Sequence, residues 1–518
     1  MSNLAENKKT DGKRGRVAII GGGIAGSGAA WALTQDHFEC SIFESSSVVG
    51  GNAKTFVWPD GLRTGLSVLA WPHEYFNNYE ALLKRLKIKH TEVNLNFYIR
   101  SASGEEYVQG DDVRSSTLWQ KHQSSLRGWR YMLSFVQIIN RVFNCFPVRK
   151  SLYRMNMLNP LNLMPLRWLS IPFGVRRECW DDIIVPMYAS TFLSTHLDYI
   201  PAIILPIISD IIPLEKSTLL RSWEENSTLV FDGMLKNVQV HLNEPVTHVK
   251  QDMNTGLWTI NQKFDGFDRI IFASNAKNVR ECRDVLPNWL RVLFHNITYT
   301  QEEDDSMSVG HIHTDDGMFP YPSMASIVET KHERVMTRER LCLKSANFIQ
   351  QRIDPSTRSI KYTNTFILSS WIPVLEGQRS LPRLVTYGAP TTSEGEKEEK
   401  GEKGEMGEIG EKGEKGEKGE KLAVEGAPAV AKRLDKVWNE WNHPSLSPVI
   451  LGVQYLLRHV QGRNGVYFCG SLATPGNGHD LSFCSGMAVA HAIGAQYPFQ
   501  EIPACLDDFL LLRKLMGL

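Results

Sequence analysis

A cluster of glycines near the start of the chain has the spacing of a phosphate-binding loop. Gly21, Gly23 and Gly26 follow the apolar run 16–20 and precede an alanine-rich run that ends at Leu33. Gly21 would make the tight turn out of a strand, Gly23 would let a pyrophosphate approach the backbone, and Gly26 would let a helix pack closely on the sheet. The spacing therefore predicts a strand, a turn and a helix that together bind a dinucleotide.

The start of this helix and the end of the next strand would supply further contacts. Free N–H groups near Ile24 and Ala25, at the positive end of the helix dipole, favour phosphate. A second apolar run, 40–43, ends at Glu44, eighteen positions after Gly26. That separation suits a carboxylate that accepts hydrogen bonds from ribose. We therefore expect Glu44 to select an adenosine ribose with a free 2′-hydroxyl.

A second glycine pair follows the acid, in the run VVGGNAKT that contains Gly50 and Gly51. This run resembles the loop that flavoproteins of the amine oxidase and phytoene desaturase superfamily place beneath FAD, where the usual pattern is Arg-x-Gly-Gly-Arg-x-x-Ser/Thr. Val48 and Asn52 replace the two arginines, whereas both glycines and Thr55 match. The resemblance implies FAD as the cofactor, with Gly50, Gly51, Asn52 and Thr55 near it.

A third glycine-rich region, near the C-terminus, resembles the flavin motif of the same superfamily. The run 465–469 is followed by Gly470 and Ser471. Further along, Gly486 and Met487 stand where we expect a helix to start. The resemblance implies that the first pair binds the ribityl or pyrophosphate part. It also implies that the helix N-terminus faces the flavin N1–C2=O edge, where its dipole would stabilise negative charge. Ser471 stands where the superfamily usually has an acid.

The chain is expected to return to the nucleotide-binding domain in its middle. Val246 opens a predicted strand, 246–249, and resembles the residue whose backbone meets the adenine, while a strand at 268–273 would run beneath the cofactor. The resemblance implies an α/β fold, in which a Rossmann-like FAD-binding domain is assembled from discontinuous segments and a mixed α+β substrate domain covers the flavin. The expected division is a flexible N-terminus at 1–15, FAD-binding segments at 16–75, 226–282 and 451–500, a substrate domain at 76–225 (largely helical) and 283–450, and a C-terminal helix at 501–518.

Two histidines are candidates for catalysis. His479 precedes the helix expected at Gly486 and is either a substrate-facing acid or base, or a hydrogen-bonded structural residue. His313 belongs to a His-Ile-His-Thr-Asp run that starts at His311. This run resembles a segment in the substrate half of FAD/NAD(P)-binding proteins of the cyclopropane-fatty-acid-associated subgroup. His311 and His313 would share one face of a strand, as two metal ligands do, but no third ligand is obvious, so we expect no metal site.

Composition favours an ordinary globular protein and argues against some partners. The chain has 518 residues, is 42% hydrophobic and carries a formal net charge of +0. A neutral chain lacks the basic footprint of a nucleic-acid-binding protein. Residues 1–15 lack the apolar core of a secretory signal, and the eight cysteines show no paired spacing. We therefore expect a cytoplasmic protein; no sequence feature predicts an oligomeric state.

The most apolar stretch, 183–213, is interrupted by Pro186, Pro201 and Pro206. A membrane-spanning helix needs about 20 consecutive, mostly apolar residues. We therefore expect no transmembrane segment here, but short buried helices or the walls of an apolar cavity, with shallow contact to a membrane surface as the alternative. The charged Gly-Glu-Lys repeats within 393–425 cannot form a core and predict a disordered surface insertion.

Together these patterns predict an FAD-dependent oxidoreductase of the amine oxidase-like type. Its small-molecule substrate, an amine or a partly hydrophobic compound, would pass a hydride to flavin N5. The apolar stretch makes a desaturase or isomerase of a lipid or isoprenoid the enzymatic alternative. A non-catalytic FAD-binding protein is the alternative of another class, because Val48, Asn52 and Ser471 replace charged residues of the resembling motifs.

Overall fold

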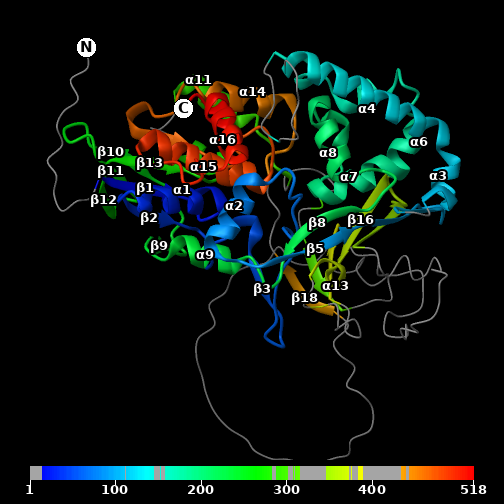
Figure 1. The fold of residues 1–518 in the computed structure, drawn as a ribbon, viewed down its shortest axis with the longest axis horizontal. Coiled ribbons are helices and arrows are strands. Elements are labelled where there is room, and N and C mark those ends of the chain that lie inside the picture. The colour runs from blue at the N-terminus through cyan, green and yellow to red at the C-terminus, as the bar shows by residue number, and fades with distance from the viewer. Residues whose placement is uncertain are drawn as a thin grey trace, which may run out of the picture.

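The computed structural model describes a molecule with two lobes side by side (Figure 1). It covers residues 14–110, 113–144, 152, 158–282, 287–300, 307, 310–314, 346–372, 375, 383–388, 433–438 and 443–518. The predicted insertion at 393–425 lies outside these described residues.

The first lobe is built on a parallel sheet of five described strands in the order β19-β13-β1-β2-β9. The strands are β1 (Arg16–Ile20), β2 (Glu39–Phe43), β9 (Gln239–His241), β13 (Arg269–Phe272) and β19 (Val466–Phe468). The three central strands, β13, β1 and β2, are almost entirely buried, as expected for a parallel sheet covered on both faces. Because three distant parts of the chain supply these strands, the predicted assembly from discontinuous segments is confirmed.

Helix α1 (Ile24–Gln35) follows β1 and packs along α15 (His479–Ile493). The two helices approach closely because a glycine stands at their contact: a Cβ on Gly486 would lie 2.1 Å from the carbonyl oxygen of Ala25. The first lobe is completed by α2 (Asn77–Leu86), α9 (Thr228–Leu235), α10 (Ala276–Glu281), α11 (Asn288–His295), α14 (Pro448–Leu457), α16 (Pro503–Met516) and a small sheet of β10 (Val249–Gln251), β11 (Trp258–Ile260) and β12 (Phe264–Phe267).

Two predicted boundaries are wrong. Helix α15, which contains Gly486 and Met487, does not start at Gly486 but seven residues earlier, at His479. Its first turn is held in place because the buried carboxylate of Asp480 accepts a 2.6 Å hydrogen bond from the backbone N–H of Tyr79, in the first turn of α2. In the middle of the chain, only Val249 of the predicted strand 246–249 is in a strand, so Val246 lies in the loop before β10.

The second lobe contains a mostly antiparallel sheet of seven described strands in the order β18-β14-β17-β16-β15-β6-β7. These are β6 (Phe97–Arg100), β7 (Glu106–Val108), β14 (Gly310–His313), β15 (Asn347–Ile353), β16 (Ile360–Ile367), β17 (Leu384–Tyr387) and β18 (Arg433–Trp438). Its helices are α3 (Thr117–Lys121), α4 (Gln123–Asn144), α5 (Leu166–Ser170), α6 (Arg177–Cys179), α7 (Val185–Phe192), α8 (Leu205–Ile211) and α13 (Leu368–Trp371). The sheet and helices together form the predicted mixed α+β part of the fold.

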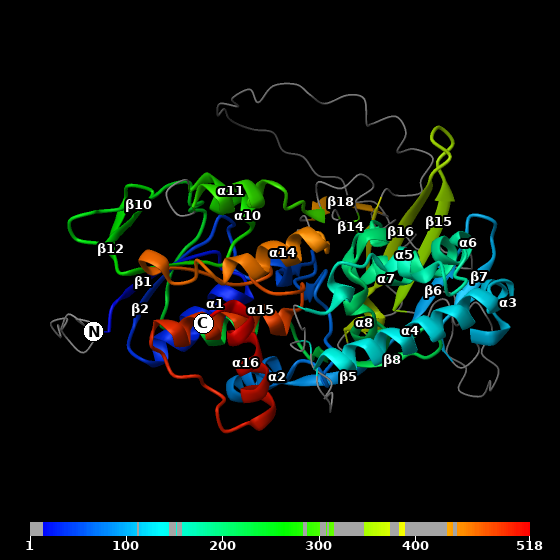
Figure 2. The same cartoon turned by 90° about the horizontal axis from the view of Figure 1, so that it is seen from above.

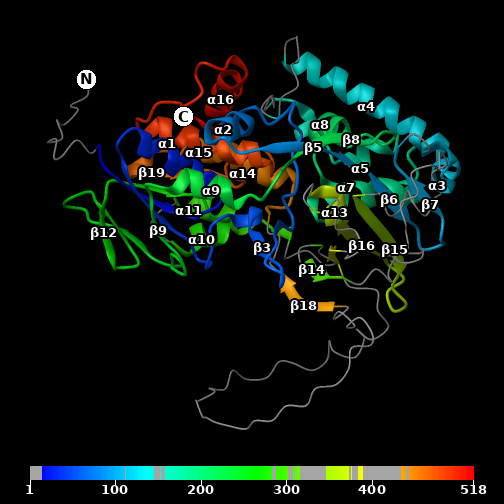
Figure 3. The ribbon, with the colours of Figure 1, turned by 60° about the horizontal axis from the view of Figure 1, so that its bottom comes forward.

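Two short ribbons, β5–β8 and β3–β4, complete the described strands: β5 (His90–Leu95) pairs with β8 (Thr218–Trp223), and β3 (Thr55–Val57) with β4 (Arg63–Gly65). β5 runs from the first lobe toward the second and leads directly into β6 (Figures 2 and 3). One crossing of the chain between the two lobes, from β5 to β6, therefore lies at the site described below.

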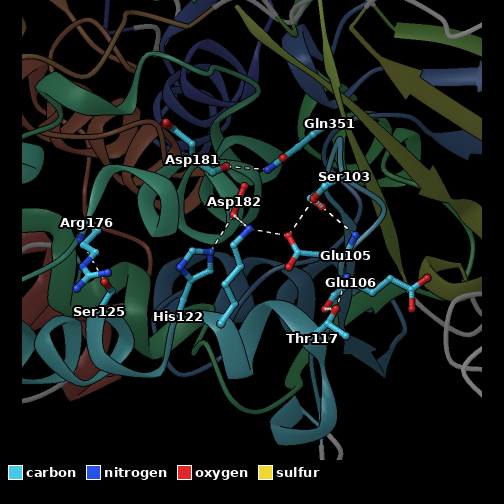
Figure 4. Close-up of polar contacts among 12 residues, drawn as sticks. Ser103, Glu105, Glu106, Thr117, His122, Ser125, Arg176, Asp181, Asp182 and Gln351 are labelled. Carbon is cyan, nitrogen blue, oxygen red and sulfur yellow. Dashed lines mark hydrogen bonds and ion pairs between the residues drawn. The ribbon is translucent and has the colours of Figure 1, made fainter.

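A polar network holds the outer end of the second lobe together (Figure 4). His122 Nε2 and Lys121 Nζ lie 2.8 and 3.2 Å from the carboxylate of Asp182, and Lys121 also contacts Glu105 at 2.6 Å. Burial by itself raises the pKa of Asp182, but the hydrogen bond from His122 and the charge of Lys121 hold it below its usual range. The network ties the β6–β7 hairpin to α3 and to the π-helical turn 180–184.

Candidate functional site

A cavity of about 620 Å³ lies where the glycine loops meet. Gly21 and Gly23 of the first loop, Gly50 and Gly51 of the second, and Gly470 of the third all line it. Three motifs that are far apart in the sequence thus face one space, with a volume in the range of ligand sites.

The first two glycine loops form one cradle. The backbone N–H of Gly50 donates to the carbonyl oxygen of Gly22 at 3.0 Å. Gly50 and Gly51 have φ angles of 125° and 55°, which favour glycine. A Cβ added at Gly23 would come no closer to other protein atoms than 3.8 Å, at the Cα of Gly51. The space above Gly23 is therefore open for a ligand, as the approach of a pyrophosphate requires.

Glu44 lines the nucleotide end of the cavity and also shapes it. Its side chain accepts hydrogen bonds from the backbone N–H groups of Gly22 and Ser46, each at 2.8 Å. The hydroxyl of Ser45 also donates to it, at 3.4 Å. A carboxylate has about four lone-pair directions, so these three protein donors leave capacity for one ribose hydroxyl. The carboxylate thus fixes the first glycine turn while facing the position expected for the ribose.

Two helix N-termini open onto the cavity. The N-cap residues are Gly23 for α1 and Gly478 for α15; both line the cavity, and neither provides a side-chain cap. Uncapped N–H groups in the first turn, such as those of Ile24 and Ala25, suit an anionic ligand. The N-terminus of α15, which is the positive end of its dipole, is therefore at Gly478 and not at Gly486.

The predicted cofactor-binding residues divide into two groups. Those that line the cavity are Gly21, Gly23, Ile24, Ala25, Glu44, Gly50, Gly51, Asn52, Val246, Gly470 and Ser471. Gly26, Thr55, Gly486 and Met487 are not in the lining and have packing roles or other contacts. A Cβ on Gly26 would lie 2.1 Å from the carbonyl oxygen of Gly21. Thr55 accepts a hydrogen bond from the hydroxyl of Thr228 at 2.7 Å, which attaches the second loop to α9.

The two predicted catalytic histidines lie in different places. His479 lines the cavity at the start of α15. Burial lowers its pKa to about 3, so the imidazole is neutral at physiological pH. Its ring stands edge-on to Tyr79, with centroids 4.8 Å apart, and its Nε2 has no hydrogen-bond partner among the described residues. His313 is absent from the lining; it is buried in β14, and its Nε2 lies 2.7 Å from the hydroxyl of Thr386.

His443 is a cavity residue to which the sequence led us to assign no role. It is buried, it lines the cavity, and burial lowers its pKa to about 4. Its Nε2 is 3.4 Å from the amide nitrogen of Asn52, in the second glycine loop. A single histidine in a loop matches no sequence motif. Its place at the cavity becomes evident only from its contact with a residue 391 positions away in the sequence.

The part of the cavity that extends into the second lobe has an apolar wall. Ile204, Ile207, Ile208, Ile211 and Ile212 line it from α8 and the turns at its two ends, and Leu95, Phe97, Leu220, Phe366 and Trp371 add to it. The apolar stretch 183–213 therefore forms short helices and a cavity wall, as expected. Within the described chain, no helix is long and apolar enough to cross a bilayer.

Comparisons with known proteins agree with this geometry. A family model described as an NAD(P)-binding Rossmann-like domain matches residues 19–86. These residues hold the first two glycine loops and Glu44. The first lobe is thus a Rossmann-like domain, and the stretch that matches a dinucleotide-binding family model lies at the cavity. No curated protein sequence matches the chain.

Solved structures extend the likeness to nearly the whole chain. A putrescine oxidase bound to putrescine superposes with a TM-score of 0.56 at 12% identity, covering 92% of this chain and 98% of that one. A CLA-producing fatty acid isomerase from P. acnes gives 0.57 at 14%, covering 93% and 99%. A reduced UDP-galactopyranose mutase gives 0.52 at 9%, covering 96% and 99%. The chain therefore shares its overall fold with these enzymes; the predicted likeness to the amine oxidase superfamily agrees with this fold, and that to the cyclopropane-fatty-acid-associated subgroup stays a prediction.

Proposed function

We propose that the protein is an FAD-dependent oxidoreductase that acts on a largely apolar small molecule. The observation that carries the proposal is the composition of the cavity. Its first-lobe end is a glycine cradle with two helix N-termini, and its second-lobe end is a wall of isoleucine and aromatic side chains. The first end suits a dinucleotide, and the second suits a hydrocarbon.

The residues present fit FAD. The open space over Gly23 would accept a pyrophosphate, Glu44 would face the adenosine ribose, and the N-terminus of α15 at Gly478 would favour negative charge on the flavin ring. When bound, FAD supplies a redox ring that accepts a hydride or two electrons. The chain would position that ring against the apolar wall and exclude water from it.

The neutral state of His479 bears on the type of reaction. With a pKa of about 3, this imidazole is neutral at physiological pH and is a poor general acid. It can accept a hydrogen bond at one ring nitrogen and donate one at the other. We therefore assign it a positioning role for substrate or ring. His313, which is buried away from the cavity, is no longer our candidate for catalysis.

A desaturation or isomerisation of a lipid or isoprenoid is the second candidate. The apolar wall favours it over amine oxidation, because the described lining near α8 offers no carboxylate to hold an ammonium group. An FAD-binding protein without turnover is the candidate of another class; it is motivated by Val48, Asn52 and Ser471 in place of charged residues.

The experiment that tests the proposal starts from purified protein. Mass analysis of small molecules released on denaturation should identify FAD. Anaerobic addition of unsaturated fatty acids, isoprenoids and amines should then bleach the flavin absorbance for one class. A flavin that resists even chemical reductant would favour the non-catalytic candidate. A colourless protein that takes up no added FAD would contradict both enzyme candidates.

A further inference from the structure

An apolar stripe runs along the exposed side of α4. Its members are Tyr131, Phe135, Ile138 and Val142, each at least 40% exposed. Their spacing of four, three and four residues places them on one stripe of the helix. The opposite side of α4 is fully used, because Leu126, Trp129, Met132 and Val136 are buried in the core. The stripe is therefore additional apolar surface, not the core-facing side of the helix.

A neighbouring segment extends this stripe. Trp168 and Ile171, in and just after α5, are 61% and 58% exposed. Phe173 joins them to α4, because its ring lies 5.6 Å from that of Phe135. We call Tyr131, Phe135, Ile138, Val142, Trp168 and Ile171 the apolar face. Contiguous exposed apolar surface of this kind marks an interaction site in a protein that must stay in solution.

Charge around the apolar face selects the kind of partner. α4 contains no acidic residue in its 22 positions and carries Arg127, Arg130 and Arg141. Arg127 and Arg141 are exposed and by helical spacing lie along one side of the stripe, whereas Arg130 pairs with Glu215 at 2.5 Å. Apolar side chains beside arginines, with tryptophan and tyrosine among them, are typical of surfaces that enter the headgroup region of a bilayer.

The apolar face and the cavity lie on opposite sides of the helix pair α4 and α8. α8 packs against α4 and contributes Ile207, Ile208 and Ile211 to the cavity wall. Asn140 of α4 also donates to the carbonyl oxygen of Ile203, which precedes the cavity residue Ile204. Figure 1 shows α4 on the outer edge of the second lobe with α8 beneath it. Two packed helices, α4 outside and α8 inside, thus separate the exposed apolar surface from the apolar end of the cavity.

We propose that the apolar face docks on an anionic lipid bilayer without crossing it. Docking places α4 at the bilayer and α8 one helix behind it, so that an apolar molecule held in the membrane reaches the cavity by a short path. The proposal of docking is supported by the surface residues alone, whereas the delivery of substrate rests on the proposed function. A second copy of the chain or a protein partner would suit the apolar side chains, but neither accounts for a helix without acids or for the adjoining cavity wall.

The test measures co-sedimentation with vesicles of phosphatidylcholine, with and without phosphatidylserine. The variant Ile138→Ser/Trp168→Ser removes two central apolar side chains. The matched control Val292→Ser/Leu510→Ser changes side chains that are 63% and 50% exposed on α11 and α16. We expect the wild type and the control to bind anionic vesicles. The affinity of the Ile138→Ser/Trp168→Ser variant for these vesicles should be at least about tenfold lower. Arg127→Glu/Arg141→Glu should weaken binding to anionic vesicles more than to neutral ones.

Vesicle binding and flavin chemistry are measured separately, so the two proposals fail separately. The docking proposal is overturned if the wild type sediments with neither vesicle, or if the control loses as much binding as the Ile138→Ser/Trp168→Ser variant. It is also overturned if the wild type is a dimer in solution that this variant converts to monomer, because a second copy would then cover the face. Bound FAD content and thermal unfolding report whether each variant is folded.

Discussion

Replacing Gly23 by alanine would separate ligand binding from folding. Gly23 is the N-cap of α1, with φ −74° and ψ −177°, a conformation that any residue adopts. An added Cβ would lie 3.8 Å from the Cα of Gly51, an ordinary contact distance, and would meet no other protein atom within 4 Å. The methyl group would instead occupy the space where we expect the pyrophosphate.

Opposing contributions to stability nearly cancel in this variant. Alanine is a poorer N-cap than glycine, which costs roughly 1 kcal/mol of helix stability. Removing a glycine from the unfolded chain contributes about 0.4–1 kcal/mol in the opposite direction. The free energy of unfolding of the cofactor-free protein should therefore change by less than about 1 kcal/mol, whereas FAD affinity should fall at least about tenfold, equivalent to ~1.4 kcal/mol.

Two assays check this prediction. Titration of cofactor-free protein with FAD, followed by quenching of flavin fluorescence, gives the affinity, and thermal unfolding without FAD gives the stability. Gly486→Ala is the matched control, because its Cβ would collide with α1 instead of entering the cavity. Wild-type FAD affinity in the Gly23→Ala protein would show that no phosphate lies over this residue, and a large loss of stability would show that our account of its surroundings is wrong.

Three further predictions follow from buried contacts. In Gly486→Ala the new Cβ would lie 2.1 Å from the carbonyl oxygen of Ala25, so the cofactor-free protein should lose about 1–3 kcal/mol, seen as a lower Tm. His443 and His479 titrate at about 4 and 3 when folded but near 6.5 when unfolded, so the unfolded chain binds more protons and stability should fall as pH drops from 6.5. His479→Gln should reduce that slope by up to about 1.4 kcal/mol per pH unit in pH-dependent unfolding. Ile208→Trp should crowd the apolar wall and raise KM for long-chain substrates at least about tenfold, with FAD content unchanged. An unaltered KM would mean that the hydrocarbon part of the substrate binds elsewhere.

The nucleotide-binding end was predictable because its determinants are local. The turn at Gly21 and the spacing to Glu44 reflect the geometry of one strand-turn-helix-strand unit, which the sequence displays directly. The start of α15 was not predictable in the same way. Gly476 and Gly478 suggest a loop, and the helix begins immediately after them because Asp480 is held by the backbone of Tyr79, some 400 residues away in the sequence.

The apolar end of the cavity shows why the sequence pattern alone is insufficient. The apolar stretch 183–213 could be assigned to buried helices or to a cavity wall, and it forms both. Which isoleucines face the cavity depends on how α8 packs against α4, and the rest of the wall comes from distant residues such as Leu95, Leu220 and Trp371. His443 and His313 illustrate the same limit, because the first is a lone histidine at the site and the second belongs to a conspicuous run that lies outside it.

The charge distribution of the cavity constrains the chemistry that can occur there. Within the described lining, Glu44 and Lys54 are the side chains that carry a formal charge at neutral pH, and both lie at the nucleotide end. Positive potential comes from the N-termini of α1 and α15, which favour anionic phosphates and a negatively charged ring without a mobile cation. Near the apolar wall the polar groups are neutral, so a reaction there cannot rely on a charged side chain to remove a proton. Such a site suits transfer of a hydride between an apolar substrate and a flavin better than deprotonation of a weakly acidic carbon.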